Sequence, residues 1–208
     1  ISVINGFFSL MDFFSANEPL FNKILESDLY VKSALSCMIP LLYISTAGIY
    51  DGANLVYDES DKPNPIGHYA KSKYLAEKYV QEHSSNYLLC RAGWMMGGGP
   101  KKDKKFIQKL MCQLADEADE LFIVNDKLGT PTYTHDFSRN VSLLIEMGKT
   151  GLYNMACKGE ASRLEVAYEL VNQLELNGTV KINEVGSEYF QKDYFQKDYF
   201  QKNYLFNS

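Results

Sequence analysis

Tyr69 and Lys73 stand four residues apart in the segment 64–77, Asn-Pro-Ile-Gly-His-Tyr-Ala-Lys-Ser-Lys-Tyr-Leu-Ala-Glu. The Asn-Pro pair predicts that a helix opens at the start of this segment, because Asn caps helices and Pro is tolerated in their first turn. On that helix the spacing places the phenol and the ammonium on one face. Upstream, the apolar run 41–46 predicts a strand that ends in the hydroxyl of Thr46.

A hydroxyl at a strand end, followed by Tyr and Lys on the next helix, is typical of nicotinamide-dependent enzymes that reduce ketones. Hydride transfer to a ketone leaves an alkoxide, which needs a proton as it forms. A phenol, with an ordinary pKa near ~10, is a poor acid–base group at neutral pH unless its anion is stabilised. A nearby ammonium stabilises that anion by Coulomb attraction, and a hydroxyl does so by hydrogen bonding. Lowering the phenol pKa by about 3 units corresponds to about 4 kcal/mol.

The spacing alone is not specific, because Tyr74 and Lys78 repeat it five residues further along the same segment. Five residues turn a helix by roughly 140°, so the two pairs cannot face one site. We expect Tyr74 and Lys78 to lie on a solvated face. The alternative for Tyr69 and Lys73 is that they too lie on a solvated helix face and have no catalytic role.

Strand and helix patterns alternate along the chain, which favours a parallel sheet flanked by helices. The predicted strands are 1–5, 41–46, 87–91, 121–125, 151–156 and 180–183. The predicted helices are 17–37, 65–83, 102–118, 135–147 and 162–174, and a polar loop covers 47–63.

The order of the motifs resembles the extended short-chain dehydrogenase/reductase superfamily, and within it the dTDP-4-dehydrorhamnose reductase family. The matching stretches run from about Val3 to Val185, and as an ordered set they are more specific than any single motif. They are Tyr43–Thr46, Tyr50–Gly52, Tyr57, Glu59, Asp61, 63–65, Tyr69–Lys73, Ala76–Glu77, Arg91–Trp94, Val124–Thr132 and Gly151–Asn154.

The resemblance implies a role for each matching residue. Tyr69 would be the general acid, Lys73 its electrostatic partner and a ligand of the nicotinamide ribose, and Thr46 the hydroxyl member, with Ser45 as the fallback. The implied cofactor-binding residues are Asn5, Gly6, Ser45, Tyr69, Lys73, Ala92 and Gly93. The implied substrate residues are Trp94, Thr130 and Pro131. For Trp94, plain core packing is an equal alternative.

The resemblance also implies the fold class: α/β, with a Rossmann-like doubly wound parallel sheet and a smaller α/β substrate-binding lobe. The expected division is 1–94 for the dinucleotide-binding part and 95–188 for the lobe, with part of 130–156 returning to the main sheet. The Gly-rich phosphate-binding turn of this fold has no counterpart in the sequence, since Gly97–Gly99 aligns with a loop near the substrate. Together with the strand-like start at Ile1, this suggests an N-terminally incomplete chain.

The implied function is NADPH-dependent reduction of the 4-keto group of a nucleotide-activated deoxysugar, as in dTDP-rhamnose biosynthesis, with NADH as the alternative cofactor. Three alternatives stay open: a non-catalytic regulatory subunit such as the beta subunit of methionine adenosyltransferase, an epimerase or dehydratase of the same superfamily, or a chain too incomplete to act. The expected partner is a sugar nucleotide, and homodimer formation is an open expectation.

Composition excludes several other classes. The chain has 208 residues and a net charge of −5, which gives no electrostatic reason to expect nucleic acid or an anionic membrane as a partner. Its apolar runs are too short to span a bilayer. The four cysteines lack metal spacing, so we expect no metal, small buried thiols and a cytoplasmic protein. From Tyr189 a five-residue repeat follows, which fits neither helix nor strand and predicts a disordered, low-complexity tail over 189–208.

Overall fold

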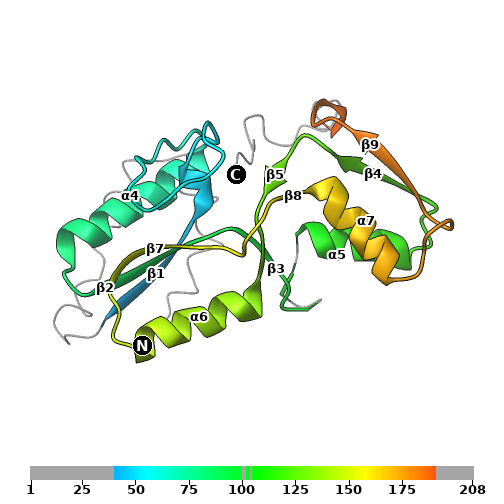
Figure 1. Ribbon diagram of the computed structural model, residues 1–208. Coiled ribbons are helices and arrows are strands. Elements are labelled where there is room, and N and C mark those ends of the chain that lie inside the picture. The colour runs from blue at the N-terminus through cyan, green and yellow to red at the C-terminus, as the bar shows by residue number, and fades with distance from the viewer. Residues whose placement is uncertain (1–39, 100–101, 104, 191–208) are drawn as a thin grey trace. The chain divides into compact units, whose positions relative to one another are not determined.

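The computed structural model describes residues 40–99, 102–103 and 105–190, which fall into two compact units (Figure 1). Of the described residues, the first unit holds 40–93 and Asp136–Ala156, and the second holds those of Trp94–His135 and of 157–190. The predicted site residues Asn5 and Gly6 lie outside the described residues. So do the predicted strand 1–5, the predicted helix 17–37 and nearly all of the repeat tail.

A three-stranded parallel sheet forms the centre of the first unit. Its order is β1-β2-β7, from β1 (Leu41–Thr46), β2 (Tyr87–Ala92) and β7 (Gly151–Met155). The register aligns Ser45 with Arg91 and Arg91 with Asn154, so the carboxyl ends of all three strands meet at one edge. The strands occur where the apolar runs predict them.

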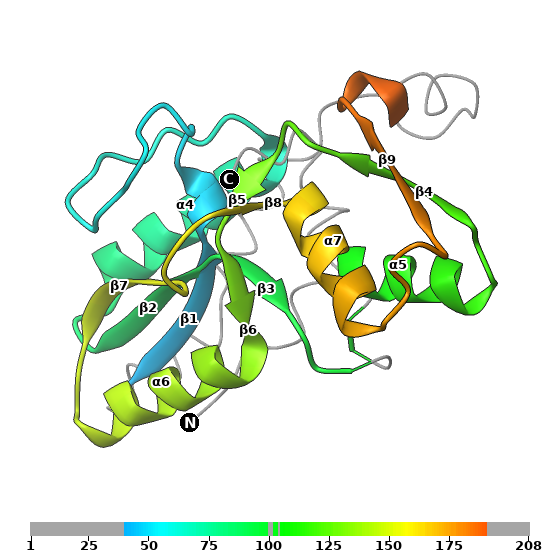
Figure 2. The same ribbon diagram turned by 45° about the vertical axis from the view of Figure 1, so that its right-hand side comes forward.

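Helices cover both faces of this sheet. On one face, Leu41 and Tyr43 of β1 pack with Val80 and Tyr79 of α4 (His68–His83). The opposite face meets α6 (Thr134–Glu146), as Figure 2 shows. Burial on both faces explains why these strands are nearly continuous apolar runs rather than alternating ones.

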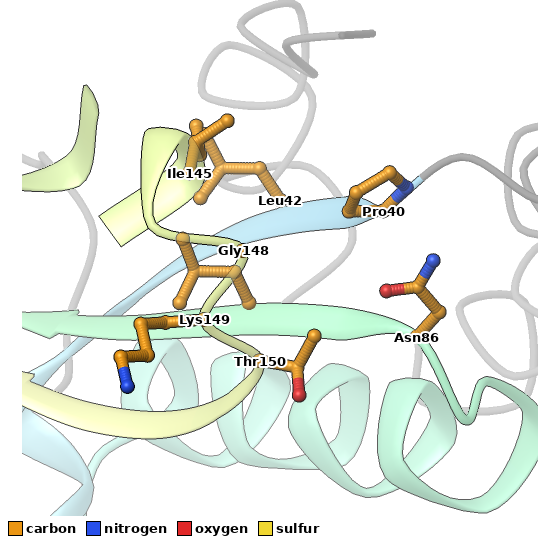
Figure 3. Close-up of a pocket in the computed structure, with 8 residues that line it drawn as sticks. Pro40, Leu42, Asn86, Ile145, Gly148, Lys149 and Thr150 are labelled. Atoms are coloured by element: carbon orange, nitrogen blue, oxygen red, sulfur yellow. The ribbon is translucent and has the colours of Figure 1, made fainter. Parts of the chain in front are cut away.

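A hollow of about 180 Å³ lies between the sheet and the end of α6 (Figure 3). Leu42 and Leu88, near the starts of β1 and β2, line it together with Ile145 of α6. It therefore lies at the amino ends of the strands, the opposite end from Thr46 and Ala92.

Helix α4 ends at His83 as predicted, but the predicted start is wrong. The helix begins at His68, and its cap residue Gly67 makes no side-chain capping bond. The Asn64 amide is used elsewhere: its Nδ2 donates to Asp51 at 2.9 Å and its backbone N–H donates to the Ile49 carbonyl at 2.9 Å. The Asn-Pro pair therefore fixes the loop before the helix instead of opening the helix.

The second unit is built from short strands and two helices around a small core. Strand β3 (Trp94–Met96) pairs parallel with β6 (Pro131–Tyr133), and β4 (Glu120–Val124) pairs parallel with β9 (Lys181–Val185). Strand β5 (Leu128–Gly129) pairs antiparallel with β8 (Ala161–Ser162). Helices α5 (Phe106–Ala115) and α7 (Arg163–Gln173) complete the unit, and its buried core is Leu110, Leu121, Ile123, Ala167 and Val171.

The α/β class with parallel sheets is confirmed. The expectation of buried thiols is wrong for Cys112 and Cys157, which are exposed, and holds for Cys90. In the described part of the chain, no cluster of metal-binding side chains occurs, and none of the helices has the length and apolarity needed to cross a membrane.

Candidate active site

Lys73 is held by α4 against the middle of β1 and is only 5% exposed. Its Nζ donates a hydrogen bond to the Ile44 carbonyl at 2.7 Å and lies 4.6 Å from the centre of the Tyr43 ring. Burial lowers the pKa of Lys73 to about 8, an effect that the Glu77 carboxylate partly offsets. The amine is therefore a buried group whose pKa lies well below its ordinary value, as is common for lysines in active sites.

Tyr43 is the residue around which this cluster assembles, and the sequence reasoning missed its contribution. Its hydroxyl is buried and has no hydrogen-bond partner among the described residues. Burial raises its pKa, and the negative charges of Glu77 and of an ionised Tyr69 raise it further. Tyr43, Tyr69, Lys73 and Glu77 thus share one electrostatic neighbourhood. The signal that could have found Tyr43 is its i, i+2 relation to Ser45 on a predicted strand.

Tyr69 lies in the first turn of α4 and is half-buried. The comparison pair behaves as predicted for its lysine, because Lys78 is exposed and its Nζ lies 5.9 Å from the Tyr74 ring. One lysine of the two i, i+4 pairs is therefore buried beside the strand, while the other is solvated. Burial of the lysine therefore distinguishes the Tyr69–Lys73 pair from the Tyr74–Lys78 pair, although both pairs have the same spacing.

The two candidate hydroxyls differ in their surroundings. Thr46 Oγ1 accepts a hydrogen bond from the Gly48 N–H at 3.1 Å and caps the short 3-10 helix η2 (Ala47–Ile49). Ser45 is 4% exposed, and its Oγ has no hydrogen-bond partner within the described ranges. Strand alternation places Ser45 on the same face as Tyr43, which α4 covers. Both residues thus keep a hydroxyl proton that can be donated.

A buried ion pair between Glu77 and Arg91 adjoins Lys73, because the Glu77 carboxylate also acts on the charge of that lysine. Glu77 and Arg91 are 0% and 3% exposed, and Arg91 donates to the carboxylate from Nη2 at 2.8 Å and from Nε at 3.2 Å. Arg91 Nη1 also donates to the Tyr50 hydroxyl at 2.6 Å. Arg91 belongs to the stretch Arg91–Trp94 that resembles the reductase family. In the structure its buried guanidinium joins Glu77 of α4 to Tyr50.

The loop 47–63 is fixed to the sheet through Tyr50. Its hydroxyl donates to the Asp58 carbonyl at 2.9 Å and accepts from the Asn154 amide at 3.1 Å. The Tyr57 ring stacks on the Tyr50 ring at 4.3 Å between centres, and the Asn154 N–H donates to the Glu59 carboxylate at 2.6 Å. Several motif residues of this loop therefore hold the loop in place beside the strand ends.

The carboxyl edge of the sheet is the expected position for a dinucleotide in an open α/β sheet. Ala92 is buried beside Thr46 in the strand register, and Gly93 follows it. Ser45, the second-last residue of β1, lies at this edge, and its buried hydroxyl has no hydrogen-bond partner within the described ranges, which fits a polar group bound there because unpaired buried polar atoms are costly. The residues present therefore fit the nicotinamide end of such a cofactor.

The three predicted substrate residues lie together in the second unit. Trp94 pairs with Pro131 across β3 and β6, and its N–H donates to the Thr130 carbonyl at 2.9 Å. The indole lies flat against Gly129, since a Cβ at that glycine would overlap three atoms of the ring system. Trp94 is half-buried, so one part of its surface packs while another part stays open.

The sequence matches one protein-family model and is similar to several known proteins. The model of the RmlD substrate binding domain matches residues 25–193. A dTDP-4-dehydrorhamnose reductase from Sinorhizobium fredii is 31% identical over 139 residues, which is 63% of this chain and 46% of that protein. Methionine adenosyltransferase 2 subunit beta from Danio rerio is 27% identical over 141 residues, 65% of this chain and 44% of that protein.

A solved structure extends the similarity to three dimensions. The dTDP-4-dehydrorhamnose reductase from Bacillus anthracis, solved in complex with NADP, has a TM-score of 0.70 and 29% identity. The alignment covers 77% of this chain and 55% of that one. The chain thus spans about half the length of the relatives that it matches.

Proposed function

The chain belongs to the RmlD substrate-binding-domain family, and from that membership we propose that it serves in the NADPH-dependent reduction of a keto sugar nucleotide. The proposed reaction is reduction of the 4-keto group of a nucleotide-activated deoxysugar. The observation that carries this proposal is the buried amine of Lys73, held beside Tyr43 on the helix that also bears Tyr69. NADPH is the proposed cofactor because a similar structure was solved with NADP.

The proposed division of labour follows from the chemistry of the cluster. When bound, the reduced nicotinamide supplies a hydride to the carbonyl carbon. Tyr69 donates its phenolic proton to the carbonyl oxygen, and the charged form of Lys73 stabilises the phenolate left behind. Thr46, or Ser45 beside it, donates a hydrogen bond to the same oxygen. Lys73, Ser45, Ala92 and Gly93 would hold the nicotinamide end of the cofactor.

The finer architecture is part of the same proposal. Residues 1–94 would form the remainder of a doubly wound dinucleotide-binding fold, and 95–188 mainly the substrate lobe. The parallel order β1-β2-β7 supports this assignment for the first unit. The substrate residues Trp94, Thr130 and Pro131 would contact the sugar nucleotide.

The test compares Tyr69→Phe with the matched control Tyr74→Phe. NADPH oxidation is followed by absorbance with a dTDP-4-keto-6-deoxysugar as substrate. Loss of the general acid should lower kcat by about 10²- to 10⁴-fold, while the control should retain activity and both should unfold at similar denaturant concentrations. Equal losses in the two variants contradict the assignment of Tyr69.

A second candidate, a non-catalytic cofactor-binding subunit, is favoured by the similarity to the Danio rerio subunit beta. The two functions differ in whether bound NADPH goes on to be oxidised. Excitation of Trp94, the single tryptophan, should give energy transfer to bound NADPH in either case. Transfer without NADPH oxidation across a panel of keto sugar nucleotides supports the subunit, and transfer with oxidation supports the reductase.

A further inference from the structure

The chain contains three arginines, and two of them have a carboxylate partner. Arg91 forms the buried pair with Glu77 at 2.8 Å, and Arg139 forms an exposed pair with Asp136 at 2.9 Å. Arg163 has neither a carboxylate nor a hydrogen-bond acceptor among the described residues. Its guanidinium instead lies over two aromatic rings, 5.6 Å from that of Trp94 and 5.5 Å from that of Phe106.

Three features of Arg163 are unfavourable in the absence of a ligand. The side chain is half-buried, and burial lowers its pKa. It is the first residue of α7, where the partial positive charge of a helix N-terminus disfavours a cation. Its planar fork has five N–H donors, none of which meets an acceptor within the described ranges. A bound anion would relieve all three.

The acid nearest to Arg163 in sequence on α7 is already used. The Glu165 carboxylate accepts from the Ser162 N–H at 2.6 Å and from the Ser162 hydroxyl at 2.8 Å, completing the capping box of α7. These bonds hold Glu165 on the cap. The Arg163 guanidinium is therefore held by the Trp94 and Phe106 rings and not by a carboxylate, so its N–H donors are available to a ligand.

We infer that Arg163, stacked on Trp94 and Phe106, is the diphosphate-binding residue of the second unit. A guanidinium matches phosphate oxygens with two parallel hydrogen bonds, and an aromatic ring on its face keeps that fork in one orientation. The choice of a sugar-nucleotide diphosphate as the ligand rests on the proposed function, whereas the anion site itself does not. Trp94 would then contact the sugar with one part of its ring system and the Arg163 guanidinium with another.

The sole tryptophan gives a direct readout, because it touches the proposed anion site. The full chain is titrated with inorganic pyrophosphate and with dTDP while Trp94 emission is recorded, and the ³¹P line width of pyrophosphate provides a second readout that does not depend on the indole. The variants are Arg163→Gln, Arg163→Lys and the matched surface control Arg139→Gln. NADP⁺ is added as a competitor, to distinguish a sugar-nucleotide diphosphate from that of the cofactor.

The expected result is saturable binding that Arg163→Gln weakens roughly 10- to 100-fold, the range for losing charge-assisted hydrogen bonds. Arg163→Lys should bind with intermediate affinity, Arg139→Gln should bind as the wild type does, and NADP⁺ should not displace dTDP. Should Arg163→Gln fail to give a cooperative melt, Arg163→Lys decides: wild-type affinity in that variant contradicts the planar-fork assignment.

Two outcomes overturn the inference. The first is the absence of saturable binding of either ligand to the wild-type chain. The second is equal affinity in Arg163→Gln and Arg139→Gln. Neither depends on turnover, so a chain that binds dTDP through Arg163 yet reduces no sugar refutes the proposed function alone. A chain that reduces a sugar nucleotide with an unchanged KM in Arg163→Gln refutes this inference alone.

Discussion

Glu77→Gln removes the carboxylate charge that receives three hydrogen-bond contacts from Arg91, while leaving the side-chain volume nearly unchanged. Both partners are essentially inaccessible to water, at 0% and 3% exposure. Breaking such a pair leaves an uncompensated buried charge and costs about 3–5 kcal/mol. For a chain of this length that corresponds to a lower melting temperature by roughly 6–20 °C.

The matched control is the exposed pair between Arg139 and Asp136, whose side chains are 73% and 46% exposed. Asp136→Asn should change the free energy of unfolding by less than about 1 kcal/mol, because solvent screens that pair. The measurement is urea denaturation followed by circular dichroism, for both variants at the same pH. Equal costs in Glu77→Gln and Asp136→Asn would refute the reasoning.

A double variant sharpens the result. Glu77→Leu with Arg91→Met removes both charges together, so its cost should be well below the sum of the two single costs. It should not reach zero, because the hydrogen bond from Arg91 to Tyr50 is also lost, at about 1–1.5 kcal/mol. Strict additivity would mean that the two charges do not interact.

Three other predictions concern different parts of the chain. The unfolded chain keeps the Lys73 proton up to its ordinary pKa of 10.5, whereas burial lowers the pKa of Lys73 in the folded chain to about 8. The free energy of unfolding should therefore rise between these pH values, by roughly 3 kcal/mol relative to Lys73→Met. Urea titrations of both proteins at pH 7 and pH 10.5 measure this difference. Gly129→Ala should displace the Trp94 indole, at about 1–3 kcal/mol and with a shifted emission maximum; an unchanged spectrum contradicts the packing. Ser162→Ala removes the cap of α7 and should cost about 1 kcal/mol, and Glu165→Gln less; a larger effect of Glu165→Gln contradicts the capping-box geometry.

The sequence was most informative where one local pattern decides the structure. Strand 41–46 follows from an apolar run, and the structure has this strand as well as the predicted end of the helix at His83. The start of α4 could not be predicted in this way, because the Asn64 amide has two competing uses. It bonds Asp51, thirteen residues earlier in the chain, and that contact exists only in the folded loop.

The candidate site shows the same limit. The types and spacing of Tyr69 and Lys73 are visible in the sequence, but the burial that separates Lys73 from Lys78 depends on which face of α4 meets β1. The two- and three-residue strands of the second unit were missed because pairing, not local pattern, holds them. Arg163 was missed for a similar reason, since its ring contacts come from β3 and α5.

Glu77 interacts with Lys73 on one side and with Arg91 on the other, so one carboxylate connects the buried amine of Lys73 to the anchored loop. A substitution at Tyr50 that lets Arg91 shift would change how strongly Glu77 acts on the amine of Lys73. For the proposed reductase, the pH optimum would therefore shift during evolution through changes at the buried Tyr50 of loop 47–63, without a change in any residue assigned to contact the reactants.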